Sequence, residues 1–180
     1  MATVAPARPL VRPPWSRRGQ EVLRLLFAVR SAPLAADLAR VAARVALAWI
    51  FIYYGAGKLF GAFNGPGIHR TALYFSNTAH LHPGGFFAVL GGLIEFGGGV
   101  AMAIGFCTRL AGLALFGDMV MAMITVTWST GIVSVSDPPG YQINLALAVL
   151  ALMMVLLGAG RFSADAVIAQ KLGVVEAGSE

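Results

Sequence analysis

The sequence contains few charged residues and a single cysteine. Charged residues make up 12% of the 180 positions and hydrophobic residues 58%, whereas soluble domains carry about a quarter charged residues. This deficit of charge indicates a membrane protein and argues against a soluble domain. The one cysteine, Cys107, excludes an internal disulfide and a multi-cysteine metal cluster, so cysteine usage does not reveal the redox compartment.

Motifs that bind nucleotides or metals are also missing. The chain has no P-loop, no Rossmann glycine fingerprint and no nucleophile elbow. Its three histidines, His69, His80 and His82, lie in one predicted connection without a nearby carboxylate or cysteine. We therefore expect no metal site, no haem held between membrane helices and no intrinsic cofactor. The net charge of +5 does not indicate nucleic-acid binding, because the positive charges are concentrated beside a membrane segment.

Four long apolar segments dominate the chain, and each approaches the roughly 20 residues that a helix needs to cross a bilayer. Backbone groups in hydrocarbon must be hydrogen-bonded within their own segment, so we expect helices. The pattern predicts an all-α membrane protein, a four-transmembrane-helix bundle within residues 38–163. The second and third helices, joined only by GFCTRL, must form an antiparallel hairpin. The predicted helices cover about residues 38–60, 84–106, 110–130 and 142–160.

Arginine and lysine residues are distributed unevenly about these helices. Eight arginines precede residue 45, and Arg109, Arg161 and Lys171 fall on the same side of the predicted bundle. The opposite connections contain only Arg70, with Lys58 at the membrane edge. The positive-inside rule therefore places both termini in the cytoplasm, with the chain in the cell membrane.

The segments outside the predicted bundle carry weaker signals. Residues 1–37 form a basic, Pro/Arg-rich cytoplasmic tail that we expect to be partly disordered. Within it, residues 20–30 either form a helix on an anionic leaflet or serve only to orient the first membrane helix, and we favour the second interpretation. Residues 164–180 form a short cytoplasmic tail. Between the first two helices, a Gly-Pro-Gly break precedes a predicted interfacial helix with Ile68, Ala72 and Phe75 on one face.

Glu95 is the one ionisable residue in the stretch GGLIEFGGGVAMAIG, residues 91–105. Its helical neighbours three and four residues away are all glycine, which lets another helix come very close. We therefore expect Glu95 to point into a helix interface or a narrow cavity. Exposure of an acid at mid-bilayer costs roughly 3 kcal/mol, so such residues are functional candidates by default. A proton-exchanging role is favoured, and a structural hydrogen bond between helices is the alternative.

Asp118 is the second acid within a predicted membrane helix, on a face of small residues. Counted from opposite ends of the hairpin, it reaches a depth similar to that of Glu95. If the two acids face each other they share a proton, because two like charges do not ionise together easily in a low dielectric. If they do not, each needs a separate partner. Both are candidate catalytic residues.

Three further polar residues are candidate substrate-binding groups: Lys58, Gln142 and Asn144. Lys58 either snorkels to the lipid headgroups or turns inward toward Gln142 and Asn144, which enter the membrane at the same level. A direct ion pair between Lys58 and Glu95 is not expected. Lys58 lies about eight residues from the middle of its helix, or roughly 12 Å at 1.5 Å per residue.

Three pieces of the chain, in this order and spacing, resemble the DoxX family of small four-helix membrane proteins. They are the first helix with its GAGKLF end (residues 44–60), GGLIEFGGGVAMAIGFCTRLAGLAL (91–115) and GAGRFSAD (158–165). The resemblance spans roughly residues 40–165. By position, Lys58, Glu95, Thr108 and Arg109 match family features, which adds Arg109 to the candidate substrate-binding residues. Trp128 stands where a histidine often ends the third helix.

The resemblance implies a redox role in a membrane complex. The family takes its name from a membrane subunit of a thiosulfate:quinone oxidoreductase, and other members are described as oxidoreductases or as parts of complexes that handle redox stress. Three functions remain open. The first is a quinone-linked oxidoreductase subunit that receives electrons from a partner redox protein. The second is a non-enzymatic anchor or assembly subunit, and the third is a proton-coupled transporter that would need to form a homodimer.

Overall fold

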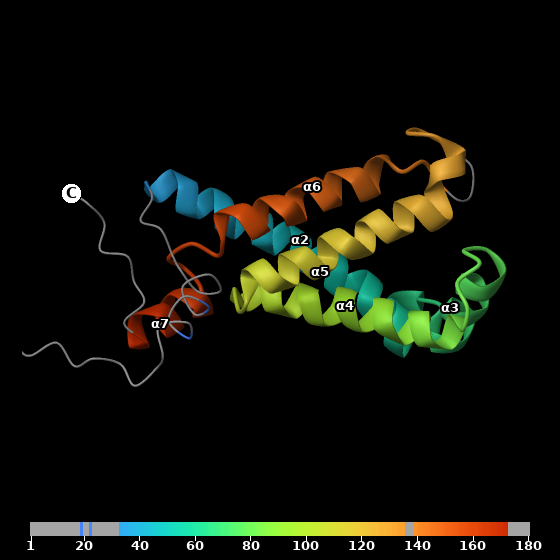
Figure 1. Ribbon diagram of the computed structural model, residues 1–180, viewed down its shortest axis with the longest axis horizontal. Helices are drawn as coiled ribbons and strands as arrows, with labels where there is room; N and C mark the ends of the chain where they lie inside the picture. The colour runs from blue at the N-terminus through green and yellow to red at the C-terminus, as the bar shows by residue number, and fades with distance from the viewer. Residues whose placement is uncertain (1–18, 20–21, 23–32, 136–138, 173–180) are drawn as a thin grey trace, which may run out of the picture.

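The computed structural model of the protein describes residues 19, 22, 33–135 and 139–172, and this part of the chain is helical, without a strand. Four long helices lie side by side (Figure 1). Shorter elements join or follow them: η1 (Ala62–Asn64), α3 (Gly67–Asn77), η2 (Met123–Thr127), η3 (Trp128–Thr130) and α7 (Ala164–Lys171). The long helices are α2 (Leu34–Phe60), α4 (Gly84–Ile104), α5 (Thr108–Ala122) and α6 (Gln142–Leu157).

The predicted all-helical fold is confirmed, and α2 begins at Leu34, before the expected residue 38. The short helix predicted between the first two long helices is present as α3, and its place at the membrane interface stays a prediction. At one end of the bundle α3 packs beside the start of α4, and α7 lies at the other end (Figure 1). We call these the α3 end and the α7 end. The tail segments at residues 1–18 and 23–32 lie outside the described residues, and so does most of the segment 20–30, for which the sequence left a leaflet-bound helix or a topology signal open.

Two stretches are long and apolar enough to cross a membrane, α4 and the continuous run Thr108–Thr130. Helix α6 is apolar but shorter. Large apolar side chains cover the outside of the bundle: Trp49 is 78% exposed and Leu156 67% exposed. Hydrocarbon solvates such side chains, whereas water does not. The surface therefore fits a lipid environment, and the crossing of the membrane by all four long helices stays a prediction.

Helices α2 and α4 cross closely because glycines lie at their contact. A Cβ atom added to Gly99 would lie 2.9 Å from the backbone nitrogen of Ile52, and one added to Gly55 would overlap the backbone of Phe96. Leu59 packs its side chain against Gly92 in the same way. These pairs fix the antiparallel register of the two helices, and they allow the backbone-to-backbone approach typical of membrane interfaces with small residues.

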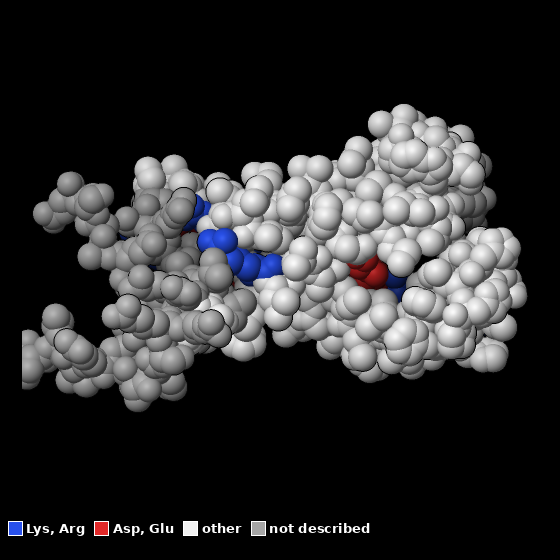
Figure 2. Space-filling model, in the orientation of Figure 1, with Lys and Arg blue, Asp and Glu red and all other residues white. Residues whose placement is uncertain are grey.

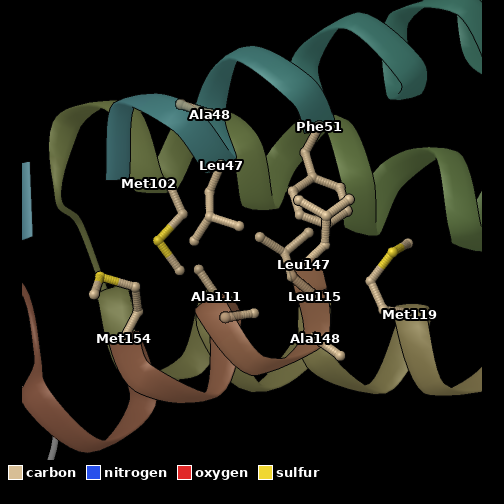
Figure 3. Packing of buried hydrophobic residues seen from close by; sticks show 11 residues of the cluster. Leu47, Ala48, Phe51, Met102, Ala111, Leu115, Met119, Leu147, Ala148 and Met154 are labelled. Atoms are coloured by element: carbon tan, nitrogen blue, oxygen red, sulfur yellow. The ribbon is translucent and has the colours of Figure 1, made fainter. Parts of the chain in front are cut away.

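The apolar core occupies the part of the bundle between its middle and the α7 end. Leu47 and Phe51 of α2, Met102 of α4 and Leu115 of α5 are each no more than 1% exposed. Figure 3 shows them turned toward one another and toward α6, which adds Ala148, Ala151 and Met154. These side chains close the interior of the bundle on this side.

A polar layer holds the α7 end together. Arg44, which is 4% exposed, donates hydrogen bonds to the carbonyl oxygens of Met102 and Ala103 at the end of α4 and of Ala159 and Phe162 beyond α6. A cation at the C-terminal end of a helix satisfies carbonyl groups that have no partner within the helix. Arg44 is therefore a structural clamp between three helices, in addition to any effect on topology.

Asp165 has the complementary role at the start of α5. Its carboxylate accepts hydrogen bonds from the backbone N–H groups of Cys107 (2.7 Å) and Thr108 (2.9 Å). A carboxylate at this position caps the helix, although it comes from the distant segment that begins α7. The GFCTRL turn and the GAGRFSAD segment, which both contribute to the family resemblance, are thus joined to each other in space.

Candidate functional site

A cavity of about 810 Å³ opens between α3, α4 and α5 toward the α3 end. Its wall is mostly apolar. Figure 2 shows a hollow with acidic and basic atoms inside it, surrounded by uncharged atoms, while the other basic atoms on this face lie toward the α7 end. The residues with polar side-chain groups that line it are Lys58, Arg70, Thr71, Tyr74, Asp118, Thr125, Thr127 and Asn144. A cavity of this size with few polar groups is typical of sites for small apolar ligands.

Lys58 and Glu95 form an ion pair beside this cavity. The Lys58 Nζ atom lies 2.6 Å from Glu95 Oε1, and the Glu95 side chain is 4% exposed. The sequence-based expectation that these residues do not pair directly is therefore wrong. That expectation placed Lys58 too far from the middle of the bundle, whereas the close α2–α4 contact sets Leu59 opposite Gly92. Lys58 and Glu95 are consequently less than one helical turn apart in depth.

Asp118 completes an acid–lysine cluster, which we define as Lys58, Glu95 and Asp118. The Asp118 side chain lies within hydrogen-bonding reach of Glu95 and within the electrostatic range of Lys58. Its Oδ1 atom would be 3.7 Å from a Cβ atom added to Gly91, so the glycine face of α4 makes room for it. Of the two arrangements that the sequence left open, the structure has the acids facing each other.

The geometry of the acid–lysine cluster favours one shared proton. Glu95 Oε2 is buried and receives no hydrogen bond from an N–H group or a hydroxyl among the described residues. A proton held between Asp118 and Glu95 would satisfy this oxygen. With that proton, the cluster of one lysine and two acids is neutral, which is the least costly charge state in apolar surroundings. The cluster can therefore donate and accept a proton at the wall of the cavity.

Parts of α3 and η2 that were not among the predicted site residues also contribute to the cavity. Lys58 lies over the ring of Phe75, 5.9 Å from its centroid, so α3 covers the cluster. Helix α5 continues into the π-helical turn η2, whose residues Thr125 and Thr127 line the cavity. The Asn144 amide donates to Thr127 Oγ1 at 3.3 Å. Wide π turns often occur at functional sites, but a single sequence gives little signal for them.

Two of the predicted substrate-binding residues are not brought to the cavity. Arg109 lies near the α7 end, where it donates to the carbonyl oxygen of Val155 at 3.0 Å. Gln142, the first residue of α6, lines a separate shallow depression on the outer face of α6. Lys58 and Asn144 do line the large cavity. Of the four candidates, only these two are placed to contact a ligand there.

Cys107 is partly buried in the turn before α5 and forms no disulfide. Burial raises the pKa of its thiol, and the negative charge of Asp165 raises it further. A raised pKa means less thiolate at neutral pH and hence lower reactivity. No group of three or more His, Cys, Asp and Glu side chains within the described ranges is arranged to hold a metal ion.

The fold and the site define a class: a helical membrane protein with a buried acid–lysine cluster at the wall of an apolar cavity. The family model DoxX matches residues 39–128, and the chain belongs to this family. The predicted resemblance is confirmed, and the matched range includes all three residues of the cluster. Comparisons of the chain with curated proteins and with solved structures give no match.

Proposed function

We propose that the protein is the membrane subunit of a quinone-linked oxidoreductase complex and that its cavity binds the quinone. The observation that carries this proposal is that Lys58 and Asp118, two members of the acid–lysine cluster, line an apolar cavity of about 810 Å³. A quinone ring with part of an isoprenoid tail is apolar over most of its surface and carries two carbonyl oxygens. It therefore needs apolar walls and a few well-placed hydrogen-bond donors.

The chemistry of quinone reduction matches what the cluster can supply. Reduction to the quinol adds two electrons and two protons, and each carbonyl oxygen becomes a hydroxyl. In our proposal Asp118, with the proton it shares with Glu95, protonates one carbonyl oxygen. Lys58 holds the charge of Glu95 and keeps the cluster electrically balanced. The electrons come from a reduced partner redox protein, because the sequence carries no motif for a redox cofactor of its own.

The proposal also specifies how the protein lies in the membrane and where its redox partner binds. All four long helices cross the cell membrane, with both termini in the cytoplasm, as the distribution of arginine and lysine predicts. Lys58 and Asn144 serve as ligand-binding groups within the cavity. The redox partner then meets the α7 end from the cytoplasm or contacts the bundle within the membrane.

A second candidate function has a specific observation in its favour. The Lys58–Glu95 ion pair joins α2 to α4 and would stabilise the bundle without any ligand. In an anchor or assembly subunit, this pair would act only as a link between helices. The two functions differ in whether a quinone occupies the cavity and in whether Asp118 affects its binding.

Replacing Asp118 with leucine should weaken quinone binding roughly ten- to a hundredfold. A hydrogen bond to a charged or proton-sharing group contributes roughly 1.5–3 kcal/mol, and leucine cannot make one. Asp118→Asn retains a donor and should bind more tightly than Asp118→Leu. Two measurements are made on the protein purified in mild detergent. Lipids extracted from one sample are tested for bound quinone, and a second sample is titrated with decylubiquinone by calorimetry to measure its affinity.

Gln142→Ala is the matched control, because Gln142 is a polar residue at the same end of the bundle but outside the cavity. It should leave the affinity unchanged. If the wild-type protein neither carries nor binds quinone while it is monodisperse and folded, the proposed function is wrong. An unaltered affinity in Asp118→Leu would leave the assembly function as the better account.

A further inference from the structure

We infer that protons and water reach the acid–lysine cluster only from the α3 end and that the α7 end of the bundle is closed to them. This inference deepens the proposed function. It rests on that function only for the statement that the protons reduce a quinone. It concerns the direction of access, which neither the family nor the presence of the cluster determines.

Toward the α7 end, α4 and α5 offer no polar side chain next to the cluster, and the two tyrosines that precede Lys58 on α2, Tyr53 and Tyr54, are 45% and 58% exposed on the outside of the bundle. On α4, every residue from Phe96 to Ile104 is apolar or glycine. On α5, the same holds from Gly117 back to Leu110, before the polar layer that begins at Arg109. Ten residues separate Asp118 from Thr108, a distance of about 15 Å along a helix. Protons move along chains of polar groups or water, and these helices supply no such groups over that length.

The space between these helices is apolar and tightly packed with side chains. Phe51, Met102 and Leu115 are each no more than 1% exposed and meet in the centre of the bundle (Figure 3). A Cβ atom added to Gly112 would lie 2.9 Å from the carbonyl oxygen of Ala151, and one added to Gly98 would lie 2.9 Å from Leu115. Since a buried water needs both room and polar partners, this packing leaves no place for a water chain.

Toward the α3 end, the cavity itself provides the path. Its lining runs from Asp118 to Pro66 and Arg70 on the cover formed by α3, and Arg70 is exposed. The charged groups in and around the cavity are the cluster itself, with Lys58 from α2, Glu95 from α4 and Asp118 from α5, and Arg70 of α3 in the cavity lining. Helix α6 contributes the uncharged Asn144. Among the residues that the structure describes, the polar groups of the cavity lining therefore lead from the cluster to the surface at the α3 end.

In the proposed reaction, protons are therefore taken up and released on one side of the bundle, the α3 side. Both protons that join the quinone on reduction enter from the α3 side, and the two electrons come from the proposed partner redox protein. Oxidation of the quinol would release two protons to that same side. The chain would accordingly not conduct protons across the membrane, which separates it from the proton-coupled transporter considered from the sequence.

Cysteine accessibility tests the inference without any quinone. In a Cys107→Ser background, Ala122→Cys places a thiol on the cavity wall, and Ala111→Cys places one in the packed core seven residues from Asp118. Each protein is reconstituted in sealed vesicles, and orientation is scored by protease digestion of an N-terminal tag. The membrane-impermeant reagent sulfonatoethyl methanethiosulfonate is added from one side, and adducts are counted by intact-protein mass spectrometry.

We expect Ala122→Cys to gain one adduct when the reagent is on the α3 side and none when it is on the α7 side. Ala111→Cys should gain none from either side. Lys171→Cys, at the exposed last residue of α7, is the control that must react only from the α7 side. If Ala122→Cys does not fold, Thr125→Cys replaces it on the same wall.

Labelling of Ala111→Cys from either side would overturn the inference, as would labelling of the cavity thiol from the α7 side. A folded cavity variant that reacts from neither side would overturn it too, because water would then not enter from the α3 end. Failure of quinone binding is a separate result that concerns the ligand. The two proposals can therefore fail independently.

Discussion

Replacing Gly99 with alanine is expected to destabilise the protein by about 3 kcal/mol, the upper part of the range for overpacking a tight interior. The added methyl group would meet the backbone nitrogen of Ile52 at 2.9 Å, and a backbone atom cannot move aside as a flexible side chain can. Helices α2 and α4 would have to separate, which would also lengthen the Lys58–Glu95 contact. Thermal unfolding in detergent, followed by circular dichroism, measures the change.

Gly97→Ala is the matched control for this variant. Gly97 lies two residues away on the same helix, and a Cβ atom added there would have no neighbour within 4 Å. Alanine is also the better helix former, by about 1 kcal/mol in water. Gly97→Ala should therefore unfold at the wild-type temperature or above it. Equal destabilisation by both substitutions would contradict the role given to the α2–α4 contact.

Lys58→Met is expected to have the second large effect. It removes the cation from the acid–lysine cluster and leaves two acids facing each other without a counter-charge. Loss of one partner from a buried ion pair costs about 3–5 kcal/mol, and we expect about 3 kcal/mol because the Lys58 side chain is 24% exposed. Unfolding is measured as for the glycine variants.

The double variant Lys58→Met/Glu95→Gln distinguishes the ion pair from simple packing of the lysine side chain. It removes both charges of the pair, so it should recover most of the stability that Lys58→Met loses. Glu95→Gln alone should also be destabilised, since it leaves Lys58 without its carboxylate partner. Additive losses in the double variant would show that the two residues do not act as a pair.

The helices could be predicted from the sequence, but the contact between α2 and α4 could not be placed correctly. Long apolar segments with glycine and proline at their ends define the helices almost without tertiary information. Counting about eight residues from the middle of its own helix puts Lys58 roughly 12 Å away from Glu95, which holds only if the middles of the two helices lie at the same depth. Gly55 and Gly99 carry the signal that corrects this, because small residues on both helices mark where their backbones approach and so fix their register.

Other parts of the site depend on contacts between distant segments. Glycines around Glu95 indicated that another group would come close to it, and Asp118 was a reasonable candidate from its depth. The cover provided by α3, with Phe75 over Lys58, depends on how a long connection folds back on the bundle. Arg44 illustrates the same limit, since its charge was read only as a topology signal although its side chain holds four carbonyl groups at the α7 end.

Photolabelling with a ring-azido quinone tests the central claim most directly. The purified protein, in mild detergent, is irradiated with the probe, and the modified residues are mapped by peptide mass spectrometry. The account predicts adducts on the cavity wall, within residues 113–127 or at Phe75, that disappear when excess decylubiquinone is present. Adducts confined to lipid-facing residues such as Trp49 and Leu156, with no competition by decylubiquinone, would contradict it.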